Sequence, residues 1–184
     1  MKKLLGKFIF FISGWKTHYK EEFKTKRCVM VAAPHTSNWD FLFAMAYYWK
    51  YGIAAKFFIK ATWTKGIHGW FIKRMGGIGV KRGKKNNLVD YAVKLFDEKE
   101  KFILLVPAEA TRKRVPKWKK GFYVIAKQAN VPVSMGYLDY KKKVIGIGGL
   151  FELTDSFESD MQKIQNFYKD INAKFPENYN KQIY

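Results

Sequence analysis

A chain of 184 residues, of which 48% are hydrophobic, can bury one continuous core and is too apolar to be a disordered tail. Its 35 Lys and Arg against 15 Asp and Glu give a formal net charge of +20, which favours nucleic acid, an anionic membrane or phosphorylated ligands as partners. The single cysteine, Cys28, excludes a disulfide framework and a cysteine-based zinc site, and indicates an intracellular protein. The three histidines are too widely separated for a paired metal motif, so we expect no structural metal.

Residues 1–25 are predicted to form an N-terminal amphipathic membrane-interface segment, with a single domain over residues 26–184. The apolar stretch of this segment is far shorter than the roughly 20 residues that span a bilayer. On a helix, one face would be apolar beside cationic groups, as in an interfacial anchor. This face comprises Leu4, Phe8, Phe11, Ile12 and Trp15. A helix packed on the protein's own core fits the same pattern, and both interpretations stay open.

The remaining chain alternates short β-rich runs with helical periods. This alternation predicts an α/β fold: a single domain with a mixed, largely parallel sheet covered by helices. We expect strands at 28–33, 56–60, 102–106, 131–138 and 144–148, and a short one that follows the glycine-rich connection at 76–80 and ends at Arg82. Helices are expected at 40–51, 88–99, 121–129 and 156–174, with an irregular or helical piece around Trp63, Trp70 and Phe71.

The segment Pro34-His35-Thr36-Ser37-Asn38-Trp39-Asp40 stands where a buried strand meets a helix. A spacing of five puts two helical side chains about 140° apart, so His35 must lie on the loop to reach Asp40. The carboxylate would then fix the imidazole tautomer and stabilise its positive charge. Without a Ser or Cys nucleophile between them, His35 would deprotonate a substrate hydroxyl that attacks a carbonyl directly. Asp40 also fits a capping box with Ser37, which would be a purely structural role.

His35 to Asp40 resembles the H-x4-D motif of the glycerol-phosphate and lysophosphatidate O-acyltransferase family. Three later segments resemble the other motifs of that family, in the same order: Gly77-Ile78-Gly79-Val80-Lys81-Arg82, Glu109-Ala110-Thr111-Arg112 and Val131-Pro132-Val133. The resemblance spans residues 34–133. It implies that His35 and Asp40 are catalytic, and that the acceptor is bound by Arg82, Glu109, Thr111 and Arg112. Lys60 and Lys81 are candidate anion-binding residues beside them.

The third motif departs from the usual P-E-G-T-R pattern at two positions. Ala108 stands where Pro is usual and Ala110 where Gly is usual, while the proline, Pro107, lies one place early. Glycine is used where the backbone needs a positive φ or where a ligand approaches closely. Because Ala110 replaces this glycine, the motif does not decide whether the acceptor headgroup is a phosphate or a carboxylate.

The resemblance implies transfer of a fatty acyl group from acyl-CoA or acyl carrier protein to a glycerophospholipid precursor such as lysophosphatidate. The acyl donor is a co-substrate, and no cofactor is expected. The alternative acceptor is the lyso form of an amino acid lipid. We expect a peripheral or monotopic protein at the cytoplasmic face of the membrane, whose partners are the lipid surface, the donor and the lysolipid.

Two noncatalytic interpretations compete with the enzyme. A basic protein that only binds membrane surfaces would share the charge, and its basic cluster would face phospholipid headgroups or an acidic carrier; the cluster comprises Lys113, Arg114, Lys117, Lys119 and Lys120. A nucleic-acid-binding module fits the charge and the 18% aromatic content. The sequence has no RNP-like run, zinc-finger spacing or helix-turn-helix pattern, so nucleic acid is not expected as a partner.

Overall fold

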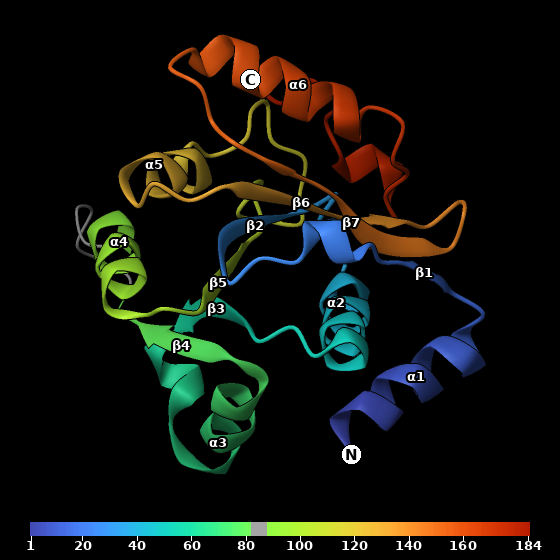
Figure 1. Cartoon of the computed structure of the whole chain (residues 1–184). Helices are drawn as coiled ribbons and strands as arrows, with labels where there is room; N and C mark the ends of the chain where they lie inside the picture. Colours follow the sequence, from blue (N-terminus) through green and yellow to red (C-terminus); the bar gives the residue numbers. More distant parts are fainter. Residues whose placement is uncertain (82–87) are drawn as a thin grey trace.

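The computed structural model describes residues 1–81 and 88–184, and its centre is a seven-stranded sheet with helices on both faces (Figure 1). The strand order is β1-β7-β6-β2-β5-β3-β4. Neighbouring strands are parallel except β6 and β7, which are antiparallel. The strands are β1 (Lys16–His18), β2 (Arg27–Ala33), β3 (Ala55–Lys60), β4 (Gly77–Val80), β5 (Phe102–Val106), β6 (Val133–Asp139) and β7 (Val144–Phe151). The predicted α/β domain with a mixed, largely parallel sheet is confirmed.

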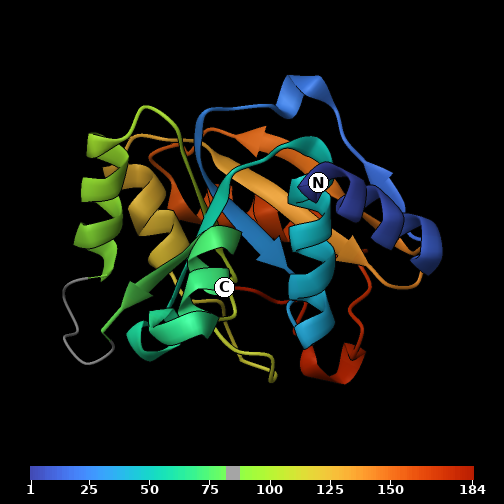
Figure 2. The same cartoon turned by 90° about the horizontal axis from the view of Figure 1, so that it is seen from below.

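Helices α5 and α6 lie on one side of this sheet, and α1 and α2 lie on the other (Figure 1). Seen from below, α3, α2 and α1 lie side by side (Figure 2). The helices are α1 (Lys2–Ser13), α2 (Asn38–Tyr51), α3 (Gly66–Met75), α4 (Leu88–Glu98), α5 (Gly121–Gln128) and α6 (Phe157–Tyr168). Short 3-10 turns are η1 (Glu21–Phe23), η2 (Ala61–Thr64) and η3 (Pro176–Asn178). Within the described ranges, no helix is long and apolar enough to cross a membrane.

The central strand β2 divides the core into two layers. Its side chains alternate between the two faces of the sheet because a strand has a period of two residues. Val29 and Val31 pack with buried residues of α4, α5 and α6, whereas Cys28 and Met30 pack with α1 and α2. All four are buried, so β2 holds a fixed position when it delivers the chain to His35.

Helix α1 packs on α2 through its small and aromatic residues and leaves its other side exposed. A Cβ atom at Gly6 would collide with the backbone carbonyl of Ala46, so glycine permits the close approach of the two helices. Phe10 is buried in this contact. Trp15, which helical spacing had grouped with Leu4, lies beyond the end of α1 and is buried as well. Its predicted place on the same helical face as Leu4 is therefore wrong.

The C-terminal helix is shorter than its apolar periodicity predicted. It was expected to reach Lys174 but ends at Tyr168, because the following chain makes tertiary contacts that a helix could not. The Asn172 carbonyl accepts a hydrogen bond from the Tyr140 N–H at 2.9 Å. The Phe175 N–H donates to Thr36 Oγ1 at 3.3 Å. The C-terminal segment thereby closes over the loop that follows β2.

Strand β1 was not predicted. Its three residues, Lys16–His18, pair with Val144, Ile145 and Gly146 of β7, so part of the expected N-terminal segment is an edge strand of the sheet. The parallel strands β2, β3, β4 and β5 all point the same way, which brings the residues that follow them to one edge of the sheet. Open α/β sheets bind ligands at this carboxyl edge.

Candidate active site

His35 and Asp40 meet at the carboxyl end of β2. His35 Nδ1 lies 3.1 Å from Asp40 Oδ2, on the loop between β2 and α2. The His35 side chain is 24% exposed and that of Asp40 only 5%, so the imidazole is reachable while its partner is buried. With its Nδ1–H donated to the carboxylate, the ring presents Nε2 as the atom that accepts a proton from a substrate.

The loop around Asp40 is held by backbone donors. Asp40 Oδ2 accepts hydrogen bonds from the backbone N–H groups of Thr36 and Ser37, both at 2.8 Å. Ser37 is the N-cap of α2, and its side chain accepts from the Trp39 N–H at 3.2 Å. The capping box expected from the sequence is therefore present. The capping box and the contact with His35 are present together, because Asp40 Oδ2 accepts a hydrogen bond in each of them.

Tyr140 completes the surroundings of Asp40, although no local sequence pattern indicated this contact. Its phenol donates to Asp40 Oδ1 at 2.6 Å. Burial, and then the hydrogen bond to Asp40, raise the pKa of Tyr140 well above its usual value, so the phenol stays a donor. Tyr140 follows β6, which lies beside β2 in parallel, and this pairing brings two distant segments together.

Glu109 lies behind the His35 loop. Its side chain is buried, and Oε1 accepts a hydrogen bond from the His35 backbone N–H at 2.9 Å. Burial raises the pKa of the Glu109 carboxyl, and the bond from His35 opposes that rise. Glu109 was predicted to bind the acceptor. The structure places it against the backbone of the His35 loop, outside the residues that line the neighbouring cavity.

The other predicted acceptor residues occupy the same edge of the sheet. The Arg112 guanidinium donates to the Asn38 side chain at the start of α2 and is otherwise exposed. Thr111 is half-buried, and its hydroxyl accepts from the Lys113 N–H at 3.3 Å. Lys60 and Lys81 are exposed, and Lys81 lines the cavity. Arg82 lies outside the described residues.

A cavity of about 830 Å³ begins at His35 and Asp40 and extends between α2, α4 and the sheet. Its volume falls within the range of small-molecule sites. The walls are mainly apolar and include Ala44, Phe57, Leu105 and Leu138, while Lys81 supplies a cation at the rim. A reactive imidazole at one end of an apolar cavity suits a substrate with a polar reacting group and a hydrocarbon chain.

Cys28 is fully buried in β2, and burial raises the pKa of its thiol to about 12, which keeps it from acting as a thiolate nucleophile. Among the described residues, no three or more His, Cys, Asp or Glu side chains gather to hold a metal ion.

Comparison with known proteins agrees with this geometry. The sequence matches the acyltransferase family over residues 15–135, whereas no curated protein matches it. The fold is similar to that of the 1-acyl-sn-glycerophosphate (LPA) acyltransferase PlsC from Thermotoga maritima, with a TM-score of 0.64 and 18% identity. That similarity covers 90% of this chain and 74% of that chain, and at this identity it shows a shared fold. Because the family match covers more than half of the sequence, the protein belongs to the acyltransferase family.

Proposed function

We propose that this protein transfers a fatty acyl group from a thioester donor, acyl-CoA or acyl carrier protein, to a hydroxyl of a lysophosphatidate-like lipid. The observation that carries the proposal is the contact between the partly exposed imidazole of His35 and the buried carboxylate of Asp40, both of which line an apolar cavity. Membership of the acyltransferase family supports the reaction class. The fold of PlsC, an LPA acyltransferase, supports the acceptor class by analogy alone.

The reaction needs no nucleophile from the protein. His35 Nε2 takes the proton of the acceptor hydroxyl as its oxygen attacks the thioester carbonyl carbon, while Asp40 stabilises the imidazolium. The tetrahedral intermediate then collapses, and the carbon–sulfur bond breaks. The imidazolium returns its proton to the departing sulfur. The products are an ester and a free thiol, and His35 is again neutral.

The acceptor headgroup would be held by the cations at the carboxyl edge of the sheet. Arg112 presents a planar guanidinium, which binds phosphate or carboxylate oxygens in pairs. Lys81, at the rim of the cavity, adds a second cation, and we assign the same task to Arg82, Thr111 and Lys60. The carboxylate of an amino acid lipid is the alternative headgroup, because Ala110 departs from the usual glycine.

A membrane location follows from the acceptor, since a lysolipid resides in a bilayer. We propose that the protein acts as a peripheral protein at the cytoplasmic face of the membrane, with α1 at the interface. The exposed side of α1 is apolar, and Lys2, Lys3 and Lys7 supply charges complementary to anionic lipid; the apolar residues are Leu4, Leu5, Phe8, Phe11 and Ile12.

The direct test supplies purified protein with each donor and each acceptor and identifies the products by mass spectrometry. Palmitoyl-CoA and palmitoyl-acyl carrier protein are the donors; lysophosphatidate and a lyso amino acid lipid are the acceptors. We expect one diacyl product with release of one thiol per ester. His35→Ala should form none. Absence of product from all four combinations in a folded, vesicle-bound protein would contradict the proposal.

A further inference from the structure

Most of the exposed large hydrophobic side chains among the described residues belong to two segments. One is α1, and the other is η2 with α3, whose exposed side chains we call the α3 face: Trp63, Ile67, Trp70 and Phe71. These four are between 56% and 79% exposed. Ile67, Trp70 and Phe71 recur at helical spacings of three and four, so they share one side of α3.

The two segments lie on the same side of the molecule. Figure 1 places α1 and α3 below the sheet, and Figure 2 shows both on the lower side of the protein with α2 between them. The Lys2 ammonium donates to the Arg74 carbonyl at 2.7 Å, which joins the start of α1 to the end of α3. The start of α1 and the end of α3 are therefore in contact on this side of the molecule.

The α3 face belongs to a closely packed unit. A Cβ atom at Gly69 would collide with the Thr64 backbone, so α3 folds tightly back on η2. The rings of Trp70 and Phe71 meet edge to face at 4.8 Å, and the Arg74 guanidinium lies 5.4 Å from the centre of the Trp70 ring. These side chains are therefore exposed on a well-packed element and not on a loose end of the chain.

The charged residues around these apolar side chains indicate what this surface binds. Residues 1–16 and 61–75 contain no acidic residue, whereas both carry cations beside the apolar side chains; in the second stretch these are Lys65, Lys73 and Arg74. Tryptophan and basic residues around an apolar patch are typical of a helix that lies in the headgroup layer of an anionic bilayer.

The end of η2 also contacts a strand that lines the active-site cavity. Gly79 lines that cavity, and a Cβ atom there would collide with the Thr64 side chain at the end of η2. We propose that η2 and α3 form a second membrane-docking element, which inserts Ile67, Trp70 and Phe71 into an anionic bilayer and sets the cavity beside the lipid surface. This inference extends the proposed function and rests on it, because docking serves to bring the cavity to a lipid acceptor.

Co-sedimentation with vesicles of phosphatidylcholine and phosphatidylglycerol, without any substrate, tests the docking element. We expect Trp70→Ser/Phe71→Ser to weaken vesicle binding by about tenfold or more, because two aromatic side chains no longer insert. Ile67→Gln should weaken it in the same direction and cannot disturb the core, since Ile67 is 79% exposed. Unchanged binding by both variants would overturn the proposal.

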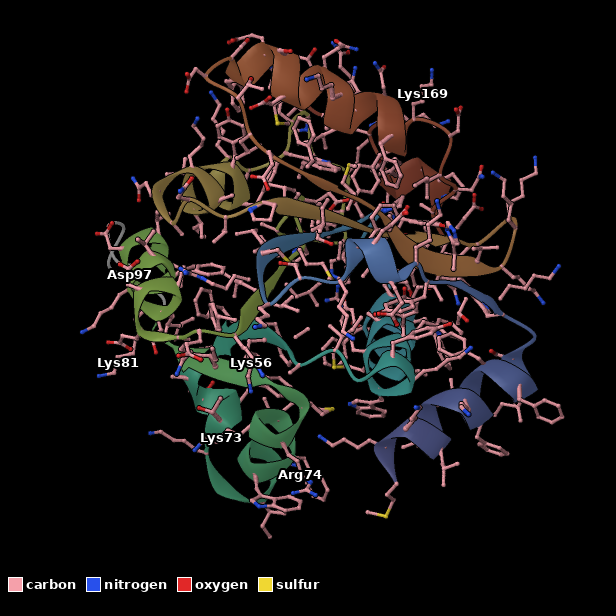
Figure 3. All side chains as sticks on the ribbon, viewed as in Figure 1. Lys56, Lys73, Arg74, Lys81, Asp97 and Lys169 are labelled. Carbon is pink, nitrogen blue, oxygen red and sulfur yellow. The ribbon has the colours of Figure 1, made fainter. Side chains whose placement is uncertain are left out.

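A matched pair of charge variants tests the orientation. Lys73→Ala/Arg74→Ala removes two cations from the lower side of Figure 3, and Lys163→Ala/Lys169→Ala removes two from α6 and its C-terminus; Figure 3 labels Lys169 on the opposite side. The first pair should weaken binding severalfold and the second should leave it within about twofold of wild type. Equal losses, or binding to DNA without binding to vesicles, would overturn the inference.

Activity distinguishes this inference from the proposed function. Trp70→Ser/Phe71→Ser should acylate a short-chain, water-soluble acceptor at the wild-type rate when no vesicles are present. A loss of that rate would place the α3 face in the cavity chemistry and overturn docking. A wild-type protein that binds vesicles as expected but acylates nothing would refute the proposed function and leave the docking element standing.

A second inference comes from the hydrogen bond between Tyr140 and Asp40. Three donors reach Oδ2 of this carboxylate, from His35, Thr36 and Ser37, while Tyr140 reaches Oδ1. The Tyr140 ring is itself fixed, because it packs edge to face on Trp15 at 4.8 Å. We infer that Tyr140 is a positioning residue, which holds the Asp40 carboxylate in the rotation that serves His35.

Tyr140→Phe keeps the ring and removes the hydroxyl. We expect kcat to fall about tenfold with KM unchanged, since small losses of alignment in a catalytic group are costly. Tyr137→Phe is the matched control, because it removes a β6 hydroxyl that bonds His18 at 3.2 Å and does not contact Asp40. It should leave kcat unchanged.

A readout without turnover separates positioning from stability. The ¹⁵N spectrum of the His35 ring reports which nitrogen carries the proton. It should show one tautomer in wild type and Tyr137→Phe and a mixture of two in Tyr140→Phe. One unchanged tautomer, or a kcat loss that merely follows the loss of folded protein, would overturn the inference.

Discussion

The backbone N–H of His35 donates to the buried carboxylate of Glu109 at 2.9 Å, so the loop after β2 is tied to the segment that follows the neighbouring strand β5. Glu109→Ala should leave that N–H without its partner. We expect a loss of about 1–3 kcal/mol in the free energy of unfolding, measured in urea, because a buried donor loses its acceptor. Glu109→Gln keeps an acceptor oxygen and is the control. Equal stability of the Ala variant and wild type would contradict this role.

The pH dependence of the Gln variant follows from the raised pKa of Glu109. A carboxyl whose pKa is higher in the folded state binds its proton more tightly there, so it favours folding at low pH. That contribution is lost as the pH rises through the folded-state pKa. Glu109→Gln should therefore gain stability relative to wild type between about pH 4 and pH 7. Denaturation curves at both pH values measure the difference, and a constant difference would contradict it.

Ala110 adopts a left-handed backbone conformation, with φ of 57°, at the position where glycine is usual in the third motif. We expect Ala110→Gly to stabilise the protein by about 0.5–1 kcal/mol, because relief of backbone strain exceeds the added entropy of the unfolded chain. Lys143→Gly, with φ of 50° far from the cavity, is the control for backbone strain alone. If only Ala110→Gly changes the preferred acceptor, the Ala110 methyl group shapes the pocket.

Arg112 is expected to bind the anionic headgroup. Arg112→Gln should raise KM for lysophosphatidate by about tenfold and leave kcat nearly unchanged, since it removes a charge-assisted contact that ground and transition states share. Arg114→Gln, an exposed neighbour, should change neither value. Initial-rate kinetics measure both. A loss confined to kcat would place Arg112 in the chemical step.

Ala44 lies on α2 and lines the apolar part of the cavity. Ala44→Leu should shorten the space for the acyl chain, so kcat/KM for the longest donors should fall about tenfold while that for short donors is retained. Leu42→Phe is the control on the same helix, because Leu42 is exposed and outside the cavity. An equal loss for long and short donors would show that the chain does not occupy this space.

The features that could be predicted from the sequence are those that depend on residues adjacent in the chain. The strand before His35 is apolar from Cys28 to Ala33 and the capping box begins α2, so the junction and its pair could be placed from seven consecutive residues. Tyr140 bonds Asp40 across 100 residues, and no local pattern signals that contact. It would follow only from knowing that β6 lies parallel beside β2.

Other differences between the predictions and the structure also arise from tertiary contacts. Glu109 and Arg112 were grouped by their motif, yet one is buried against the His35 backbone and the other is exposed beside Asn38. The burial of Glu109 depends on how the segment after β5 packs under the loop after β2, and sequence spacing does not encode that packing. The C-terminal helix was predicted too long because its apolar period continues to Ile171, where tertiary contacts of the following chain replace the helix.

The central claim is that His35 is the catalytic base, and the rate of ester formation with lysophosphatidate tests it most directly. His35→Ala should lower kcat by about a thousandfold or more, the scale of general base catalysis, while vesicle binding and the unfolding midpoint stay at wild-type values. His18→Ala, which replaces another histidine on the sheet, should retain the full rate. A His35→Ala protein that forms the ester at the wild-type rate would contradict the account.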